Sequence, residues 1–184
     1  MKDNTGHSAL LVMDVQTGIV NRLENGKEYL ERLGTAIDAA HRNRMPVIYV
    51  VVGFRPGFPE ISSRNKSFGR IRGAASDGMV NPVPAIDPIG DDMVVVKRRV
   101  SAFSGSDLEV VLRSLDIGHL VLSGIATGGV VLSTVREAAD KDYQLTVLSD
   151  LCADFDPEVH QILVGKIFPK QADVTSSNDW INHL

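Results

Sequence analysis

Residues 9–15, which read ALLVMDV, decide the fold class. They form a nearly continuous apolar run that closes on a carboxylate, Asp14. Such a run is typical of a strand in a parallel sheet, where helices cover both faces of the strand. We therefore expect a buried parallel strand here, with Asp14 at its carboxyl end.

Four more short apolar segments have the same character. They lie at residues 47–52, 93–97, 119–123 and 145–148. Apolar residues at helical spacing separate most of them and mark helices within residues 30–40, 108–115 and 131–138. This alternation, with right-handed crossovers, predicts an α/β fold: a three-layer α/β/α sandwich around a Rossmann-like parallel sheet.

The bulk composition narrows the class of protein. The chain has 184 residues, 43% of them hydrophobic and 23% charged, with a net charge of -4. We expect a single domain over residues 1–184 and no nucleic-acid partner. The short apolar run near the start is broken by Asp14, which predicts neither a secretory signal nor a membrane span. The single cysteine, Cys152, agrees with the cytoplasmic location that we expect.

Residues 53–92 break the alternation. They contain five prolines and several glycines, show no sustained periodicity, and carry basic and aromatic side chains. A segment of this length without regular structure is usually functional or disordered. We interpret it as a pocket lid or a subunit contact, and the alternative is a solvated surface excursion.

Two charged residues end buried strands, and we expect them to meet. Asp14 follows the first strand and Lys97 ends the third. Ligands of open α/β sheets bind outside the carboxyl ends of the strands, where such side chains gather. A desolvated Asp–Lys pair suits proton transfer beside a stabilising cation. The alternative for each residue is a structural ion pair or a helix cap.

A turn of small residues, SGIATGGV at 123–130, follows the fourth strand. Backbone amides at the start of a helix bind anions, so this turn is a candidate cradle for an oxyanion or a carboxylate. It lacks the lysine and the glycine spacing of the nucleotide-binding loops. Tight glycine turns are also common in parallel folds without any ligand.

Three stretches together resemble the isochorismatase-like hydrolases, the cysteine hydrolase superfamily that includes nicotinamidases. They are LLVMDVQ at 10–16, VVVKRRVSAFSGSDLEVVL at 94–112, and LVLSGIATGGVVLSTVREAADKDYQLTVLSDLCAD at 120–154. The residues that fit the family pattern are Asp14, Lys97, Phe103, Ser106, Asp107, Leu108, Gly124, Ile125, Ala126, Thr127, Val131, Thr134 and Ala138. The resemblance implies a six-stranded parallel sheet of order 3-2-1-4-5-6 and a homodimer or higher homo-oligomer.

The resemblance also implies a catalytic site. Its catalytic positions are Asp14, Lys97 and Val130, and Val130 stands where the family has its nucleophilic cysteine. A non-proline cis peptide is expected between Ile125 and Ala126. The implied oxyanion and substrate-binding residues are Ile125, Ala126, Thr127, Gly129 and Phe103. We read Cys152 as a small structural hydrophobe rather than a substitute nucleophile.

The chain also departs from the nicotinamidases in their metal motif. Those enzymes have D-W-H after the second strand, whereas this chain has Gly53, Phe54 and Arg55. The histidines are scattered without ligand spacing, so we expect no catalytic metal and no cofactor. Arg55 offers a planar fork for a substrate carboxylate, and the alternative is a surface arginine.

Three functions are compatible with these residues. The first is a hydrolase of a small, carboxylated molecule, cleaving an amide or vinyl-ether bond with Asp14 as general acid/base and Lys97 as its partner. In this scheme the amides of Ala126 and Val130 stabilise developing negative charge. The second is a catalytically silent member that binds a small molecule. The third is a weak amidase that uses a water activated by Asp14. None of them requires a membrane.

Overall fold

The computed structural model describes residues 8–73 and 77–184. Its centre is a six-stranded parallel sheet of order β3-β2-β1-β4-β5-β6, which confirms the expected fold. The strands are β1 Ser8–Met13, β2 Val47–Val52, β3 Met93–Lys97, β4 His119–Ile125, β5 Gln144–Ala153 and β6 Asp173–Thr175. The strand order reverses between β1 and β4, so the ligand-binding crevice of this fold class lies beyond their carboxyl ends.

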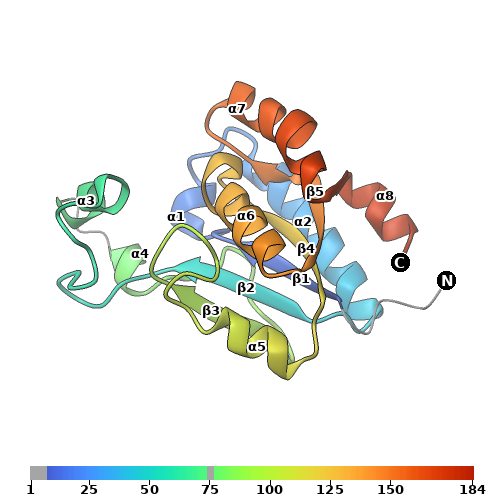
Figure 1. Ribbon diagram of the computed structural model, residues 1–184, viewed down its shortest axis with the longest axis horizontal. Helices are drawn as coiled ribbons and strands as arrows, with labels where there is room; N and C mark the ends of the chain where they lie inside the picture. The colour runs from blue at the N-terminus through green and yellow to red at the C-terminus, as the bar shows by residue number, and fades with distance from the viewer. Residues whose placement is uncertain (1–7, 74–76) are drawn as a thin grey trace.

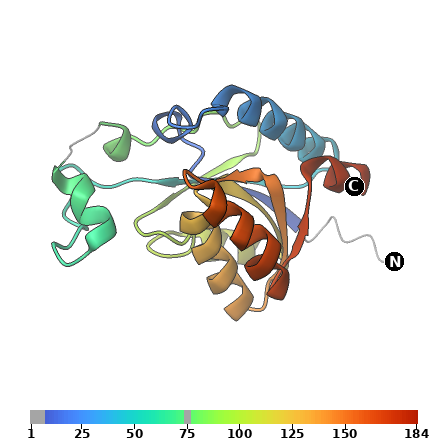
Figure 2. The same ribbon diagram turned by 90° about the horizontal axis from the view of Figure 1, so that it is seen from above.

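Helices cover both faces of the sheet, as Figures 1 and 2 show. The helices are α1 Thr17–Val20, α2 Gly26–Arg42, α3 Lys66–Gly73, α4 Asp77–Val80, α5 Leu108–Ser114, α6 Leu132–Asp140, α7 Pro157–Ile162 and α8 Ser177–Asn182. In Figure 2, α2 and α8 lie on one side of the sheet, and α6 and α7 lie on the other. No helix in the described ranges is long and apolar enough to cross a membrane.

The two faces of β1 belong to two separate hydrophobic clusters. Leu11 and Met13 pack in the cluster that includes residues of α5 and α6, whereas Leu10 and Val12 pack in the cluster that includes residues of α2. Successive side chains of a strand point to opposite faces. Both faces of β1 are buried, and this explains its continuous apolar sequence.

Two strands differ in length from the sequence prediction. Strand β1 ends at Met13. The amide of Asp14 still donates to the Val50 carbonyl of β2 at 2.7 Å, but Asp14 adopts a left-handed φ of 55°, which ends the strand. Strand β5 runs on to Ala153, past the predicted end at residue 148, and its pairing with β4 shifts register between Leu122 and Gly124. Because of this shift, the polar residues after residue 148 still belong to the strand. A search for apolar runs ends the strand too early, since it does not detect such irregular pairing.

Residues 53–92, predicted to be irregular, contain the short helices α3 and α4. We call residues 53–73 the arm; α3 stands off the sheet in both views (Figures 1 and 2). A small aromatic cluster holds the arm together: the ring of Phe54 lies 5.4 Å from that of Phe68 and 6.1 Å from that of Phe58. The arm therefore has a core of its own, which the prolines and glycines of the sequence conceal.

Candidate active site

The structure brings Asp14 and Lys97 together across the end of β2. The Lys97 Nζ atom lies 2.9 Å from Oδ2 of Asp14, and only 1% of the Lys97 side chain and 10% of the Asp14 side chain are exposed. The same ammonium also donates to the carbonyls of Arg99 at 2.9 Å and Val100 at 3.0 Å. An ammonium has three N–H donors, so these three contacts use all of them. Lys97 therefore holds Asp14 in place and has no donor left for a ligand.

The second carboxylate oxygen of Asp14 is free. Within residues 8–73 and 77–184, Oδ1 is buried and has no hydrogen-bond partner. Burial raises the pKa of Asp14 to about 6, although the neighbouring Lys97 lowers it. Burial also lowers the pKa of Lys97, against the effect of Asp14. Asp14 is thus a carboxyl group that changes protonation near neutral pH and has one oxygen available, as a general acid or base requires.

A cavity of about 420 Å³ lies over this pair. It is lined by Asp14, Val52, Ser67, Phe68, Lys97, Val100, Ala126, Gly128, Gly129 and Val130. The β1, β2 and β3 ends form its floor, the turn after β4 forms one wall, and the arm contributes Ser67 and Phe68. The arm thus lies where a pocket lid is expected.

The turn after β4 approaches β1 closely. A side chain at Gly124 would place its Cβ 2.4 Å from the Met13 carbonyl oxygen, so only glycine fits between these strands. The peptide bond between Ile125 and Ala126 is cis, as expected. Thr127–Val131 then form one π-helical turn that leads into α6.

Several amides of this turn are already bonded within the protein. The Gly128 amide donates to Oδ2 of Asp154 at 2.6 Å. The amides of Gly129 and Val131 donate to the Ala126 carbonyl at 3.0 and 3.3 Å. The turn is therefore not an open cradle in which every amide faces a ligand. Ala126 and Val130 also lie at the cavity wall, together with Gly128 and Gly129.

Two of the expected site residues lie behind the turn. Ile125 is 2% exposed and packs in the α2-side cluster. Thr127 is fully buried, and its Oγ1 lies 2.8 Å from Nδ1 of His160. Neither residue lines the cavity, so they hold the turn from behind. Sequence reasoning missed Asp154 and His160, although Asp154 follows β5, the strand next to the turn.

Phe103 and Arg55 lie away from the cavity. The Phe103 ring packs 5.9 Å from the ring of Tyr143. The Arg55 guanidinium bonds Oε1 of Glu60 at 2.8 Å, and 69% of its side chain is exposed. The expected roles of both residues in binding substrate therefore find no support in this arrangement, because each side chain is engaged elsewhere.

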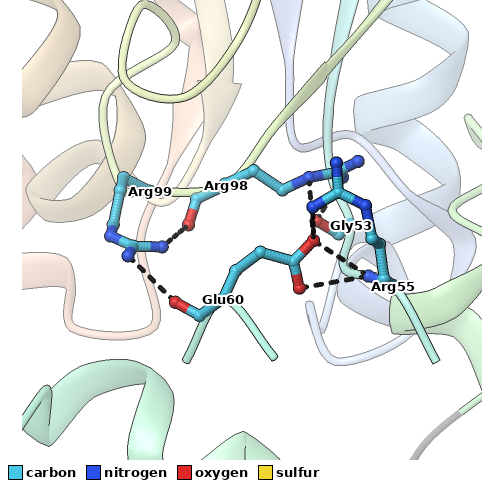
Figure 3. A network of polar contacts seen from close by, with 5 residues as sticks. All are labelled: Gly53, Arg55, Glu60, Arg98 and Arg99. Atoms are coloured by element: carbon cyan, nitrogen blue, oxygen red, sulfur yellow. Dashed lines mark hydrogen bonds and ion pairs between the residues drawn. The ribbon is translucent and has the colours of Figure 1, made fainter. Parts of the chain in front are cut away.

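Glu60 ties the arm to the segment after β3, as Figure 3 shows. Its carboxylate also lies 3.6 Å from Arg98, whose guanidinium donates to the Gly53 carbonyl at 2.5 Å. Arg99 donates to the Glu60 carbonyl at 3.0 Å. This network anchors the segment that supplies the carbonyl acceptors of Lys97, and Arg99 belongs to both, because its own carbonyl accepts from Lys97.

Cys152 does not line the cavity over Asp14. It is 4% exposed and lines a different cleft, between β5 and the start of α2. Burial raises the pKa of its thiol to about 12. A thiol with this pKa is not a nucleophile at neutral pH. Among the described residues, no three His, Cys, Asp or Glu side chains converge into a group that could hold a metal ion.

These features are those of a known family. The isochorismatase domain model matches residues 8–179, and the chain belongs to the isochorismatase family. Members of this family whose activity is named include a ureidoacrylate amidohydrolase of Cronobacter sakazakii. That protein is 27% identical over 78% of this chain and 73% of its own length.

Other relatives match over more of the chain. An uncharacterized isochorismatase family protein of Escherichia coli O157:H7, YecD, is 28% identical over 98% of both chains. A probable inactive nicotinamidase of Arabidopsis thaliana is 28% identical over 87% of both chains. Among solved structures, an isochorismatase family protein from Burkholderia thailandensis has a TM-score of 0.79 at 28% identity and covers 95% of this chain and 93% of its own.

Proposed function

We propose that this protein is a hydrolase that cleaves an amide or vinyl-ether bond of a small molecule, with Asp14 as its general acid/base. The observation that carries the proposal is the buried, unpartnered Oδ1 of Asp14 beneath a cavity of about 420 Å³. A buried polar atom without a partner is costly, and such atoms are concentrated where a ligand completes the bonding. The amidohydrolase activity named for the Cronobacter relative supports the reaction class.

Lys97 is a positioning residue in this scheme. Its ammonium fixes Oδ2 of Asp14 and keeps the pKa of that carboxyl lower than burial alone would set it. With an amide, the protonated carboxyl donates its proton to the nitrogen as a water oxygen bonds to the carbonyl carbon and the C–N bond breaks. With a vinyl ether, it donates its proton to the terminal alkene carbon, water adds to the carbon that bears the oxygen, and the resulting hemiketal breaks its C–O bond to release the alcohol. The ionised carboxylate then takes up a proton from that water, and Asp14 returns to its starting state.

We propose that Val130 stands at the position where the cysteine hydrolases carry their nucleophile. Val130 lines the cavity, and its side chain has no lone pair for covalent attack. Water is therefore the attacking group in our scheme, and no thioester forms. The backbone amides of Ala126 and Val130 are the proposed donors to the negative charge on the substrate.

The substrate in this proposal is carboxylated, and the turn receives its anionic group. Arg55 was the expected partner for a carboxylate, but it is paired with Glu60 outside the cavity. Lys97 lines the cavity, but its ammonium already makes three hydrogen bonds within the protein and has no N–H left for the substrate. We therefore assign the carboxylate or carbonyl oxygen to the amides at the start of the π-helical turn.

A second candidate is a binding protein without catalysis. Val130 favours it, because a family member without a nucleophile keeps the cavity but loses covalent chemistry. One relative of this chain is named as a probable inactive nicotinamidase, and that name agrees with a family member that lacks catalysis. In this reading Asp14, held in place by Lys97, serves only to bind ligand.

Incubation with a panel of small carboxylated amides and enol ethers separates the two functions. Ligands are first selected by thermal shift, and each incubated ligand is then analysed by mass spectrometry. Conversion by the natural protein but not by Asp14→Asn, with binding retained, supports the hydrolase. Binding without conversion selects the binding protein, and conversion that survives Asp14→Asn rules out Asp14 as the acid/base.

A further inference from the structure

A second cleft lies between the end of β5 and the segment that joins α1 to α2. We call it the β5 cleft; it is the one that Cys152 lines. Its volume is about 510 Å³, which is within the range of small-molecule sites. Among the described residues, none lines both this cleft and the cavity over Asp14. The β5 cleft is therefore separate from the candidate active site.

Two unpaired arginines line the β5 cleft. Arg22 lies in the segment before α2, Arg32 lies on α2, and both are exposed. Within residues 8–73 and 77–184, neither guanidinium makes a hydrogen bond or an ion pair. Charges of one sign that line a hollow attract a ligand of the opposite sign. The two arginines thus favour an anion.

The two aspartates in the wall are already bonded within the protein. The two carboxylate oxygens of Asp150 accept from the amide and the hydroxyl of Ser177, each at 2.6 Å. Those of Asp154 accept from the amides of Gly128 at 2.6 Å and Asp156 at 3.2 Å. Donors of this kind stabilise a carboxylate and leave it less able to bind a ligand cation.

Glu24 is the remaining acid of the β5 cleft. It is exposed, and no hydrogen bond or ion pair of its carboxylate occurs among the described residues. Two free guanidinium groups therefore face one free carboxylate, which leaves an excess of one positive charge. That balance suits a ligand with a single negative charge better than a dianion.

An aromatic ring stands beside one of the arginines. The Arg22 Cζ atom lies 4.3 Å from the centre of the Phe155 ring, and 45% of Phe155 is exposed. A guanidinium held against a ring keeps N–H donors at its edge, and these match the two oxygens of a carboxylate. The exposed part of the ring offers an apolar surface to a flat group that follows the carboxylate.

We propose that the β5 cleft binds a small monocarboxylate with a planar apolar group, an aromatic acid in chemical class. Arg22 and Arg32 are its donors, and Phe155 is its apolar contact. Asp154 connects this cleft to the turn after β4, because it lines the cleft and holds the amide of Gly128. The proposal does not depend on the reaction at Asp14.

Titration with benzoate, followed by nuclear magnetic resonance of the backbone amides, tests the proposal. We expect saturable shifts in residues 22–32 and 150–157. Arg22→Gln and Arg32→Gln should each weaken binding about tenfold, because each removes a charged donor. Glu24→Gln should tighten binding, since it removes the free negative charge. Acetate, which lacks the ring, should bind more weakly than benzoate.

Arg42→Gln is the matched control. Arg42 is an exposed arginine in the last turn of the same helix, α2, and it does not line the β5 cleft. We expect this variant to bind benzoate as the natural protein does. Weakening by Arg42→Gln equal to that by Arg32→Gln would overturn the proposal, as would phosphate binding as tightly as benzoate. Shifts confined to residues 97–100 and 126–130 would place benzoate over Asp14 and would also overturn it.

Discussion

The carboxylate of Asp154 accepts a hydrogen bond of 2.6 Å from the amide of Gly128, and this contact fixes the turn above the candidate site to the end of β5. A bond from a charged acceptor to a backbone amide contributes roughly 1.5–3 kcal/mol. We expect Asp154→Ala to lower the free energy of unfolding by about 1–2 kcal/mol, measured by urea denaturation. Asp154→Asn keeps an acceptor oxygen and should lose less. Equal losses in the two variants would show that the bond does not hold the turn.

Asp14 should titrate near neutral pH. Its pKa is raised to about 6 by burial, with Lys97 acting in the opposite direction. Nuclear magnetic resonance of the side-chain carboxyl carbon measures this pKa directly and needs no substrate. We expect Lys97→Met to raise it further, because the variant removes the lowering effect of the ammonium. An Asp14 pKa near the ordinary value of 3.8 would contradict the buried, unpartnered state of Oδ1.

The same shift predicts a dependence of stability on pH. Because the folded protein holds the Asp14 proton more tightly than the unfolded chain, this contribution to stability is complete below pH 3.8 and is lost as the pH rises to about 6. The loss amounts to roughly 3 kcal/mol at most. We expect Asp14→Asn to lack this component when unfolding is measured from pH 4 to 7. Identical pH profiles for the two proteins would contradict it.

Restoring a thiol at residue 130 tests the site without a known substrate. We expect Val130→Cys to be alkylated by iodoacetamide at the new thiol, faster than a free cysteine, because Lys97 and the turn amides favour its thiolate. The natural protein is the control, since burial raises the pKa of Cys152 to about 12 and should leave it unreactive. New amidase activity in this variant would show that the rest of the apparatus is intact. Slow labelling, no faster than Cys152, would place residue 130 outside a nucleophile site.

Gly124 should not tolerate any side chain. Its added Cβ would lie 2.4 Å from the Met13 carbonyl oxygen, and backbone atoms of two paired strands cannot move apart cheaply. We expect Gly124→Ala to lower the free energy of unfolding by about 3 kcal/mol or more. The control is Gly34→Ala on α2, where no atom lies within 4 Å and the change should stabilise by about 0.5–1 kcal/mol. Similar effects at the two positions would contradict the close approach of β4 to β1.

The sheet could be predicted from the sequence because its central strands are buried on both faces. Residues 9–13 and 47–52 have no polar interruption, and the ladder pairs them as expected. The pairing of Asp14 with Lys97 follows from the same rule, since both end parallel strands at one edge of the sheet. The end of β5 could not be predicted, because its continuation depends on a register shift against β4.

Contacts that the sequence pattern does not reveal explain where the structure differs from the expected site. Arg55 was expected to bind a ligand, but a carboxylate five residues later, Glu60, binds it instead. Thr127 showed no base nearby in sequence, yet His160 lies 2.8 Å away in the fold. Phe103 fits a family motif, but its ring packs on Tyr143. Residue type and spacing identify candidates, whereas the fold decides which of them face the cavity.

The saturated ammonium of Lys97 also determines how charge in the cavity responds to a ligand. With Asp14 ionised, the two side chains carry no net charge, and with Asp14 protonated they carry one positive charge. An anionic ligand therefore binds better to the protonated form, so Asp14 takes up a proton from solvent as the ligand enters a site in which it was ionised. Calorimetry in buffers of different ionisation enthalpy would record that proton as part of the heat of binding. The affinity of the cavity for an anionic ligand therefore falls as the pH rises, and one carboxyl group sets this dependence.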